Sequence, residues 1–419
     1  MLTGKRILLV ISGGIAAYKS LELIRLMRKS GADVGCILTK GGAEFITPLS
    51  VAALSGNSVY TDLFSLKDET EMGHIRLSRE ADLIVVAPAS ANMMAKMAYG
   101  MADDLASTVL LASDKPVIVC PAMNPQMWNN PATQDNIRTL EQRGIQRIGP
   151  ASGDMACGEE GAGRLVEPEE IVKNIESYFA QNKPLAGYSA IVTSGPTHEP
   201  IDPVRFIGNH SSGRQGHAIA QSLSDAGAAV TLITGPVAIL DPQDVKTIHV
   251  TTAREMLDAC QNALPADIAV CAAAVSDWTP KQTSGQKIKK DGQAPTITLT
   301  ENPDILAHLS QMKKDRPVLV IGFAAETENL IENARIKLAR KQCDAIVAND
   351  VSNGQIFGED RNQVYFITTD GAVEWPESSK RRVAQEIVEQ IKARLTNQTI
   401  EEQKQKLQAG WEGSRPQVG

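Results

Sequence analysis

The sequence predicts an α/β protein made of two doubly wound, Rossmann-like domains, each built on a mainly parallel sheet. Short β-branched apolar runs alternate with amphipathic helical patterns along most of the chain, which is typical of parallel strands covered by helices. The chain also opens in the same way twice, with a strand, a small polar loop and a helix at Arg6 to Met27 and again from Ile191. Because helix N-termini favour phosphate, each opening predicts an anionic ligand.

Size and charge limit what the protein does. Its 419 residues are enough for two domains of ordinary size. A net charge of −7 and a pI near 5.5 argue against a general role on nucleic acids or membrane surfaces. The apolar run after Lys5 is interrupted too early for a secretory signal, and no segment reaches membrane-spanning length. Six scattered cysteines without a CxxC pair favour reduced thiols in a cytoplasmic enzyme.

The first domain begins with a βαβ unit. Arg6 to Ile11 is predicted as a buried strand, the segment from Ser12 to Ala17 turns it into a helix that ends at Gly31, and Val34 to Thr39 is the next strand. The loop lacks the spacing G-x-G-x-x-G, and no acidic residue clearly ends the second strand to bind a ribose. A phosphate or a flavin therefore fits this loop better than NAD.

Two later strands of this domain run into small polar residues. Leu83 to Ala87 leads into Pro88 to Asn92, and Val117 to Cys120 leads into Pro121 to Trp128. Open α/β sheets bind ligands at the carboxyl ends of their strands, so both segments are expected in the site. Gly153 to Arg164 is too glycine-rich for a helix or a strand, which predicts a mobile loop that closes over a substrate.

The second domain follows a helix and a linker. The helix is expected at Pro168 to Phe179, the linker at Gln181 to Pro184, and a partly disordered polar tail from about Thr396. The expected strands are Ile191 onward, Val230 to Thr234, Ile268 to Ala272, Val318 to Gly322 and Ala345 to Ala348, with a hairpin at Val364 to Thr369 and Ala372 to Trp375. The expected helices are His217 to Ala226, Ala253 to Asn262 and Leu330 to Lys341.

An ordered set of motifs resembles a known family. In the first half, the segments from Ser12 to Ala16, Pro88 to Asn92 and Pro121 to Trp128, with Cys157 in its glycine-rich loop, resemble the flavin-dependent cysteine decarboxylases. The second half resembles the phosphopantothenoylcysteine synthetases. The motifs that carry this resemblance are GNHSSGRQG (208–216), AAAVSDW (272–278), KIKK (287–290), NPDIL (302–306) and GFAAET (322–327). Both halves in this order resemble the bacterial bifunctional coenzyme A biosynthesis proteins over nearly the whole chain.

The resemblance implies two activities in one chain. A flavodoxin-like FMN-dependent decarboxylase would occupy residues 1–189, and a CTP-dependent ligase residues 190–419. The ligase would join 4'-phosphopantothenate to L-cysteine through an acyl-cytidylate, with Mg²⁺ neutralising the triphosphate. The decarboxylase would then form 4'-phosphopantetheine through a thioaldehyde and an enethiolate made with FMN. The family also implies a homo-oligomer, a dodecamer of decarboxylase trimers joined through ligase dimers.

Residue roles in the decarboxylase come from the same resemblance. His74 resembles the active-site base, Asn124 the group that orients the carboxylate, and Cys157 the proton donor. Expected contacts to the substrate are Asn124, Gly161, Gly163 and Arg164. Expected contacts to FMN are Ser12, Gly13, Gly14, Ile15, Thr39, Ser90, Asn92 and Met123. Without the motifs, His74 would be interpreted as a structural histidine and Cys157 as a small apolar residue.

Roles in the ligase are carried over likewise. Asn209 matches the residue that converts the acyl-cytidylate and contacts its substrate, and Lys287 is placed at the triphosphate. Lys337 and Lys341 lie four residues apart, so a helix would present both on one face. Expected contacts to CTP are Ala272, Ala273, Asp277, Lys287, Pro303, Asp304, Ile305, Leu306, Phe323, Lys337 and Lys341, and Asp277 is also expected at the metal. Taken alone, the basic run 287–290 is an ordinary solvated charge cluster in a mobile segment.

Two other functions are consistent with parts of the pattern. A flavin-binding regulatory subunit could share the first fold without catalysis, but His74, Asn124, Cys157 and the ligase motifs all remain in this sequence. An NAD-dependent dehydrogenase with duplicated Rossmann domains would need a dinucleotide fingerprint, which neither half contains. Retained catalysis by both halves is therefore the preferred interpretation.

Overall fold

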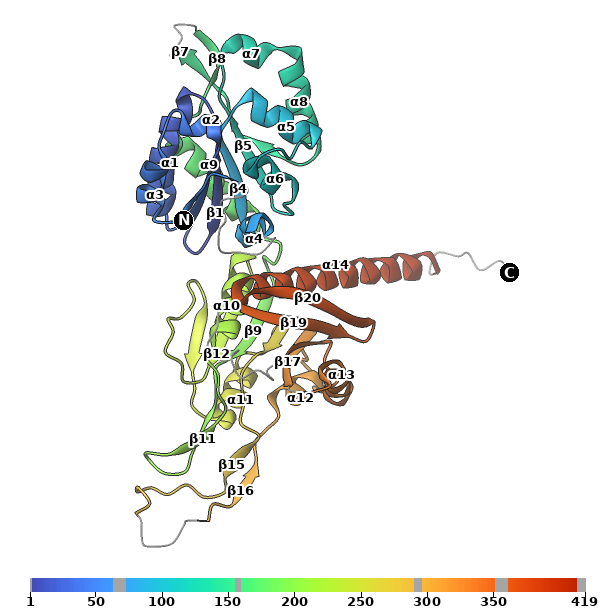
Figure 1. Ribbon diagram of the computed structural model, residues 1–419. Coiled ribbons are helices and arrows are strands. Elements are labelled where there is room, and N and C mark those ends of the chain that lie inside the picture. The colour runs from blue at the N-terminus through green and yellow to red at the C-terminus, as the bar shows by residue number, and fades with distance from the viewer. Residues whose placement is uncertain are drawn as a thin grey trace, which may run out of the picture. The chain divides into compact units, whose positions relative to one another are not determined.

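The chain divides into two compact units, Met1–Asn182 and Lys183–Gly419. The computed structural model describes residues 2–62, 73–154, 160–289, 296–326, 328–350 and 361–412 (Figure 1). No helix in these ranges combines the length and the apolar character that a membrane span requires.

The first unit is a doubly wound sheet of parallel strands in the order β3-β2-β1-β4-β5-β6. The strands are β1 (Arg6–Ile11), β2 (Asp33–Leu38), β3 (Val59–Tyr60), β4 (Leu83–Ala89), β5 (Val117–Pro121) and β6 (Gln146–Arg147). The helices are η1 (Ile15–Ala17), α1 (Tyr18–Lys29), α2 (Lys40–Ala43), α3 (Pro48–Ser55), α4 (Gly73–Glu80), α5 (Ala91–Tyr99), α6 (Leu105–Leu111), α7 (Pro125–Asn129), α8 (Pro131–Gln142) and α9 (Pro168–Gln181). This is the six-stranded Rossmann order, which refines the flavodoxin-like expectation and confirms a doubly wound parallel sheet.

Both faces of this sheet are covered. Alternate β1 residues point to opposite faces, as the two-residue period of a strand requires. Ile7 and Leu9 pack with α1, α3 and α9, whereas Leu8 and Val10 pack with α5, α6 and α8. The continuous apolar run of β1 is therefore explained by burial on two sides.

The expectation that the glycine-rich segment 153–164 forms no strand was wrong for its described residues, 153–154 and 160–164. The glycine-rich segment forms strands, because β7 (Ala151–Asp154) pairs antiparallel with β8 (Glu160–Arg164). Gly153, Gly161 and Gly163 have φ values of 142°, 159° and 142°. Glycine reaches such φ values without steric strain, so a glycine-rich sequence can still form a two-stranded ribbon.

The second unit has a mixed sheet in the order β13-β12-β9-β14-β17-β18-β19-β20, in which only the last two pairings are antiparallel. Its strands are β9 (Ser189–Ser194), β12 (Ala229–Thr234), β13 (Lys246–His249), β14 (Ile268–Cys271), β17 (Leu319–Glu326), β18 (Ala345–Asp350), β19 (Arg361–Thr368) and β20 (Gly371–Ser379). Two small ribbons pair β10 (His198–Pro200) with β11 (Phe206–Gly208) and β15 (Trp278–Pro280) with β16 (Leu299–Glu301). The first six strands of the large sheet repeat the order of the first unit, which confirms the second Rossmann-like domain.

Helices again cover both faces of the second sheet. They are α10 (Arg214–Asp225), α11 (Ala253–Asn262), α12 (Ile305–Ser310), α13 (Leu330–Lys341) and α14 (Lys380–Glu412). Val192 packs with α10 and α14, whereas Ile191 packs with α11, α12 and α13. Where a partly disordered tail was expected from about Thr396, α14 continues as far as Glu412, and Gln, Glu and Lys are good helix formers.

Candidate functional site

Four loops of the first unit meet at one edge of its sheet. Strands β2, β1, β4 and β5 are adjacent and parallel, so the loops that follow them emerge at the same edge. The strand order reverses between β1 and β4, and such a switch point is where open α/β sheets bind ligands. Every residue predicted to contact FMN lies on one of these loops or at the start of the helix that follows it, as Ile15 in η1 and Asn92 in α5 do. The fold therefore brings together motifs that are far apart in the sequence.

Ser12 connects two of these loops. Its hydroxyl donates to the carbonyl oxygen of Pro88 at 2.7 Å and accepts the backbone N–H of Ser90 at 2.9 Å. The Oγ of Ser90 then accepts the N–H of Met93 at 3.2 Å and caps α5. Because the backbone N–H of Ser12 also donates to Pro88, Ser12 has no donor left for a ligand. Its side chain holds the loops together, and the residues after it must supply donors to an anion.

Gly13 and Gly14 can supply those donors. Neither backbone N–H donates to an acceptor within the described part of the chain. A Cβ placed on Gly14 would meet no atom within 4 Å, so this backbone borders open space. A Cβ on Gly13 would lie only 3.0 Å from the carbonyl carbon of Gly41 in the loop after β2. Two uncommitted amides in a turn that is open beside Gly14 fit the phosphate group of a flavin nucleotide.

The loop after β5 is held by the β7–β8 ribbon. The N–H of Met123 donates to the carbonyl oxygen of Gly163 at 2.9 Å, and a Cβ on Gly161 would lie 3.1 Å from Pro125. The Oδ1 of Asn124 accepts the N–H of Met127 at 2.9 Å, which caps α7. This bond orients the side-chain amide of Asn124 so that Nδ2 is its donor end.

Three more residues were predicted for the decarboxylase site: Arg164, His74 and Cys157. Arg164 lies at the end of β8 and forms an ion pair with Glu167 at 3.1 Å, with its side chain 42% exposed. Glu167 also pairs with Lys19 at 2.9 Å, and the hydrogen bond from Lys19 lowers the pKa of this carboxyl. His74 lies on α4, but its side chain is outside the described residues, as is all of Cys157. Arg164 is thus tied to the start of α9, whose N-cap is Glu167.

The other cysteines are unsuited to acid–base chemistry. Burial raises the pKa of the Cys36, Cys120 and Cys260 thiols to about 12 and that of Cys343 to about 11. Burial also raises the pKa of Cys271 well above its usual value. These thiols stay protonated at neutral pH and behave as small apolar groups.

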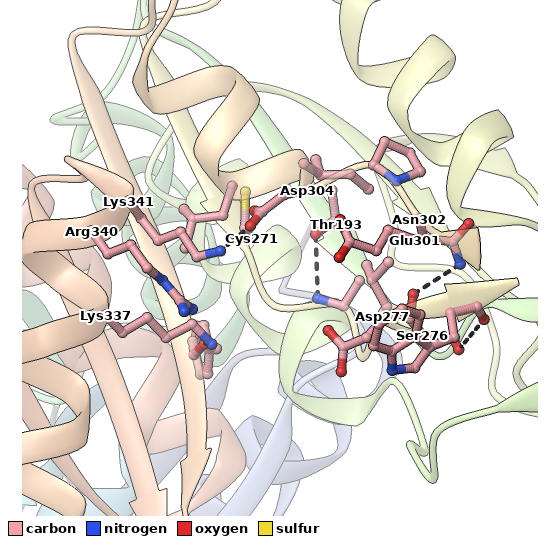
Figure 2. Close-up of a pocket in the computed structure, with 17 residues that line it drawn as sticks. Thr193, Cys271, Ser276, Asp277, Glu301, Asn302, Asp304, Lys337, Arg340 and Lys341 are labelled. Atoms are coloured by element: carbon pink, nitrogen blue, oxygen red, sulfur yellow. Dashed lines mark hydrogen bonds and ion pairs between the residues drawn. The ribbon is translucent and has the colours of Figure 1, made fainter. Parts of the chain in front are cut away.

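The second unit contains a cavity of about 480 Å³ at the carboxyl ends of β9, β14 and β17 (Figure 2). Predicted residues that line it are Ala273, Asp277, Pro303, Asp304, Ile305, Leu306, Phe323, Lys337 and Lys341. The lining residues that were not predicted from the sequence are Thr193, Cys271, Val275, Ser276, Trp278, Glu301, Asn302 and Arg340. Arg340 could have been found from its helical spacing to Lys337, and Thr193 and Cys271 from their positions at strand ends.

The walls of this cavity carry opposite charges. Lys337, Arg340 and Lys341 project from α13, and Figure 2 shows Asp277 and Glu301 on the far side of the cavity. Lys337 donates to the carbonyl oxygen of Phe323 at 2.9 Å. A cationic wall suits the phosphates of a nucleotide, and a carboxylate across from it can bind a ribose or a cation.

Asp304 connects the two walls. Its Oδ1 accepts the N–H of Ala307 at 2.9 Å and caps α12, while its Oδ2 forms an ion pair with Lys341. The Lys341 side chain is only 13% exposed. Asp304 therefore holds Lys341 in the cavity through a helix cap that is itself fixed by the backbone.

Three predicted ligase residues do not line the cavity. Ala272 lies next to it and donates its N–H to Thr193 O at 3.2 Å. Asn209 follows β11, and its Nδ2 donates at 2.9 Å to the carbonyl oxygen of Val275, a lining residue. Lys287 is exposed and lies on a segment that is anchored through its neighbour Ile288, whose N–H donates to Asp202 at 3.2 Å. Backbone hydrogen bonds thus hold this segment as far as Ile288.

No group of three His, Cys, Asp or Glu side chains in the described ranges is arranged to hold a metal ion. Mg²⁺ commonly uses one or two carboxylates, and the phosphates of a nucleotide complete its coordination. Asp277 is placed to be such a carboxylate.

Comparisons with known proteins match both units. Residues 1–180 match the Flavoprotein family, and residues 185–395 match the family described as DNA/pantothenate metabolism flavoprotein C-terminal domain. The coenzyme A biosynthesis bifunctional protein CoaBC of Haemophilus influenzae is 46% identical over 391 residues, which span 93% of this chain and 98% of that protein. The protein of the same name from Vibrio vulnificus is 48% identical over 394 residues, with the same two shares. A crystal structure of the C-terminal domain of a CoaBC protein is 39% identical, covering 51% of this chain and 99% of its own with a TM-score of 0.44.

Proposed function

The chain belongs to the family of bifunctional coenzyme A biosynthesis proteins, and from this premise we propose that it converts 4'-phosphopantothenate to 4'-phosphopantetheine in two steps. The second unit ligates the substrate to L-cysteine with CTP, and the first unit decarboxylates the product. The observation that carries the proposal is the charge-divided cavity of the second unit. It lies where a doubly wound sheet binds a nucleotide, and it offers cations to phosphates and a carboxylate to Mg²⁺.

The ligase must first activate a carboxylate. Its oxygen attacks the α-phosphorus of CTP, pyrophosphate leaves, and the amine of cysteine then displaces CMP from the acyl carbon to form the amide. Lys337, Lys341 and Lys287 stabilise the charge that develops on the phosphates, and Asp277 faces the ribose or the Mg²⁺ ion. Asn209 adjoins this chemistry through its bond to Val275, where its amide can hold the acyl oxygen or the attacking amine.

The decarboxylase needs an electron sink, which FMN supplies when bound by taking electrons from the cysteinyl thiol and later returning them. The switch-point loops hold the cofactor, with the amides of Gly13 and Gly14 toward its phosphate. The Nδ2 of Asn124 donates to the substrate carboxylate, which is lost as CO2. His74 acts as the base, and Cys157 returns a proton to the enethiolate.

We further propose that the protein is a homo-oligomer of the cytoplasm. Large apolar side chains are exposed on each unit, including Ile15 at 59% and Tyr99 at 77% in the first, and Val204 at 61% and Phe206 at 52% in the second. Trimers through the first unit and dimers through the second would bury both sets and build the dodecamer expected for the family. The five described cysteines are free thiols, as a reducing compartment requires. A full-activity monomer by light scattering would contradict this assembly.

The two activities are tested in one reaction. Purified protein is incubated with 4'-phosphopantothenate, cysteine and Mg²⁺ with either CTP or ATP, and pyrophosphate and CO2 are followed. We expect CTP-dependent pyrophosphate release followed by CO2. Absence of pyrophosphate with CTP would refute the ligase, and absence of CO2 from supplied phosphopantothenoylcysteine would refute the decarboxylase.

Two variants test the residue roles. Cys157→Ser is expected to release CO2 but to accumulate oxidised product, because the enethiolate lacks its proton donor; normal formation of 4'-phosphopantetheine would contradict that role. Asn209→Asp is expected to accumulate the acyl-cytidylate, and unchanged ligase turnover would count against the assignment.

A further inference from the structure

The loop between β10 and β11 is organised around one buried carboxylate. The side chain of Asp202 has no exposed surface. Its Oδ1 accepts the backbone N–H groups of Val204 at 2.8 Å and Arg205 at 2.9 Å. The loop is also closed by the N–H of Ile201, which donates to the carbonyl oxygen of Arg205 at 2.8 Å. Asp202 therefore gives this hairpin a single, well-defined tip.

The same carboxylate reaches a segment that is distant in the sequence. The Oδ2 of Asp202 accepts the N–H of Ile288 at 3.2 Å, and the guanidinium of Arg205 donates to the carbonyl oxygen of Ile288 at 2.8 Å. Arg205 Nε also lies 3.6 Å from the Asp202 carboxylate. Both backbone polar groups of Ile288 are thus held, and Ile288 is the residue that follows Lys287.

A second set of bonds fixes the chain just before Lys287. The N–H of Ser284 donates to the carbonyl oxygen of Ile201 at 3.0 Å, and the hydroxyl of Thr283 donates to that of Pro200 at 3.3 Å. Lys287 itself is exposed, and no burial of its own side chain would hold it in place. Its position therefore depends on the hairpin.

The other end of the hairpin leads to Asn209. Strand β11 ends at Gly208, and the next residue, Asn209, donates to the carbonyl oxygen of Val275 at the cavity. Because β10 pairs antiparallel with β11, the short strand β11 connects the hairpin tip at Asp202 to Asn209. One hairpin thus links Asn209 and Lys287, which the sequence places 78 residues apart (287 minus 209).

We propose that Asp202 is a positioning residue for the ligase, which sets Lys287 relative to Asn209 and the cavity. This inference rests on the proposed ligase function. A lysine on an exposed segment would otherwise sample many positions, and even a 1 Å displacement of a group in an active site can lower a rate about 100-fold. Three N–H donors to one buried carboxylate keep that displacement small.

A double-mutant cycle tests the proposal. Ligase kcat/KM is measured for the full chain, Asp202→Asn, Lys287→Gln and the double variant, with decarboxylation of supplied phosphopantothenoylcysteine as the internal reference. We expect Asp202→Asn to lower ligase kcat/KM by about 10- to 100-fold and to add nothing in the Lys287→Gln background. Multiplying effects in the double variant, or full ligase activity of Asp202→Asn, would overturn the proposal.

Two further variants separate positioning from folding. Arg205→Ala removes the other side-chain bond to Ile288, and because the Arg205 side chain is 43% exposed, the variant should keep its fold. It should lower ligase kcat/KM as Asp202→Asn does, with no further effect in the Lys287→Gln background. Asp267→Asn is the matched control, because Asp267 accepts the N–H and the hydroxyl of Ser189, both at 2.7 Å. These residues lie at the amino ends of β14 and β9, whereas the cavity lies at the carboxyl ends of the same strands. The control variant should lower stability without coupling to Lys287. Coupling of Asp267→Asn to Lys287 would contradict the proposal.

The outcomes distinguish this inference from the proposed function. Wild-type protein without CTP-dependent ligation would refute the ligase itself. Wild-type activity with an unimpaired Lys287→Gln variant would refute the role of Lys287, and the inference with it. Wild-type activity, an impaired Lys287→Gln variant and no coupling to Asp202 or Arg205 would refute the positioning role alone.

Discussion

Replacement of Gly13 by alanine tests whether the close contact between the β1 and β2 loops builds the flavin site. A Cβ on Gly13 would lie 3.0 Å from the carbonyl carbon of Gly41 and 3.1 Å from its Cα and oxygen. Ordinary contacts of a Cβ begin at 3.4 Å, so one loop must move by about 0.4 Å. Gly13 does not have a positive φ, so the conflict is steric and not conformational.

The expected loss follows from overpacking at a backbone contact that no rotamer change can relieve. Such substitutions cost about 1–3 kcal/mol. If the displaced loop recovers its position only when FMN binds, the same free energy appears as a roughly 5- to 150-fold weaker affinity. We therefore expect Gly13→Ala to fold with a reduced melting temperature and to bind FMN within this range of weaker affinities.

The assay is a titration of flavin-free protein with FMN, followed by quenching of flavin fluorescence. Gly35→Ala is the matched control, since its Cβ would lie 3.6 Å from Leu8 Cδ1, an ordinary contact, within β2. FMN affinity of Gly13→Ala within twofold of the wild type would refute the reasoning. An equal loss in Gly35→Ala would show that the effect is general to the sheet.

Three further predictions concern the second unit. Burial lowers the pKa of His217 below its usual 6.5, so the unfolded chain takes up the proton first and the stability of the fold should decrease as the pH drops below about 6.5. His217→Gln should flatten this pH dependence, measured by urea unfolding between pH 7 and 5. An unchanged pH dependence in the variant would contradict the prediction. Gly216→Ala would place a Cβ 2.6 Å from Ser194 Cβ, so denaturant unfolding should show a loss of about 3 kcal/mol, and a loss below 0.5 would argue against the packing described. Lys341→Gln removes the partner of Asp304 from the cationic wall and should raise the KM for CTP about tenfold, while decarboxylation is unchanged. An unaltered KM would show that Lys341 does not contribute to CTP binding.

The regular elements could be predicted because their cause is local. In the run from Arg6 to Ile11, every residue after Arg6 is apolar, whichever side of the sheet it faces, and β1 has those same bounds. The helix from Leu330 to Lys341 was predicted with its observed limits, and its spacing correctly brings Lys337 and Lys341 to one cavity. Each of these predictions depends only on side-chain periodicity, which the sequence contains in full.

The β7–β8 ribbon could not be predicted from its composition. Its glycines have no side chains to give a two-residue pattern, so the strands exist because backbone groups pair across the ribbon and because it contacts the loop after β5. The anchoring of Lys287 could not be predicted from the sequence for a similar reason. The bonds to Ile288 come from Asp202 and Arg205, on a loop more than 80 residues away in the chain.

By itself, the sequence determined the two doubly wound units, the order of the motifs and about half of the residues around the cavity of the second unit. Only the tertiary structure decided that both donors of Ser12 bind the carbonyl oxygen of Pro88. It also decided that Arg340, Glu301 and Asn302 line the same cavity, and that one hairpin connects Asn209 with Lys287. The physical reason is one of range. Burial and periodicity act on neighbours in the chain, whereas hydrogen bonds between loops depend on where the sheet brings the ends of its strands.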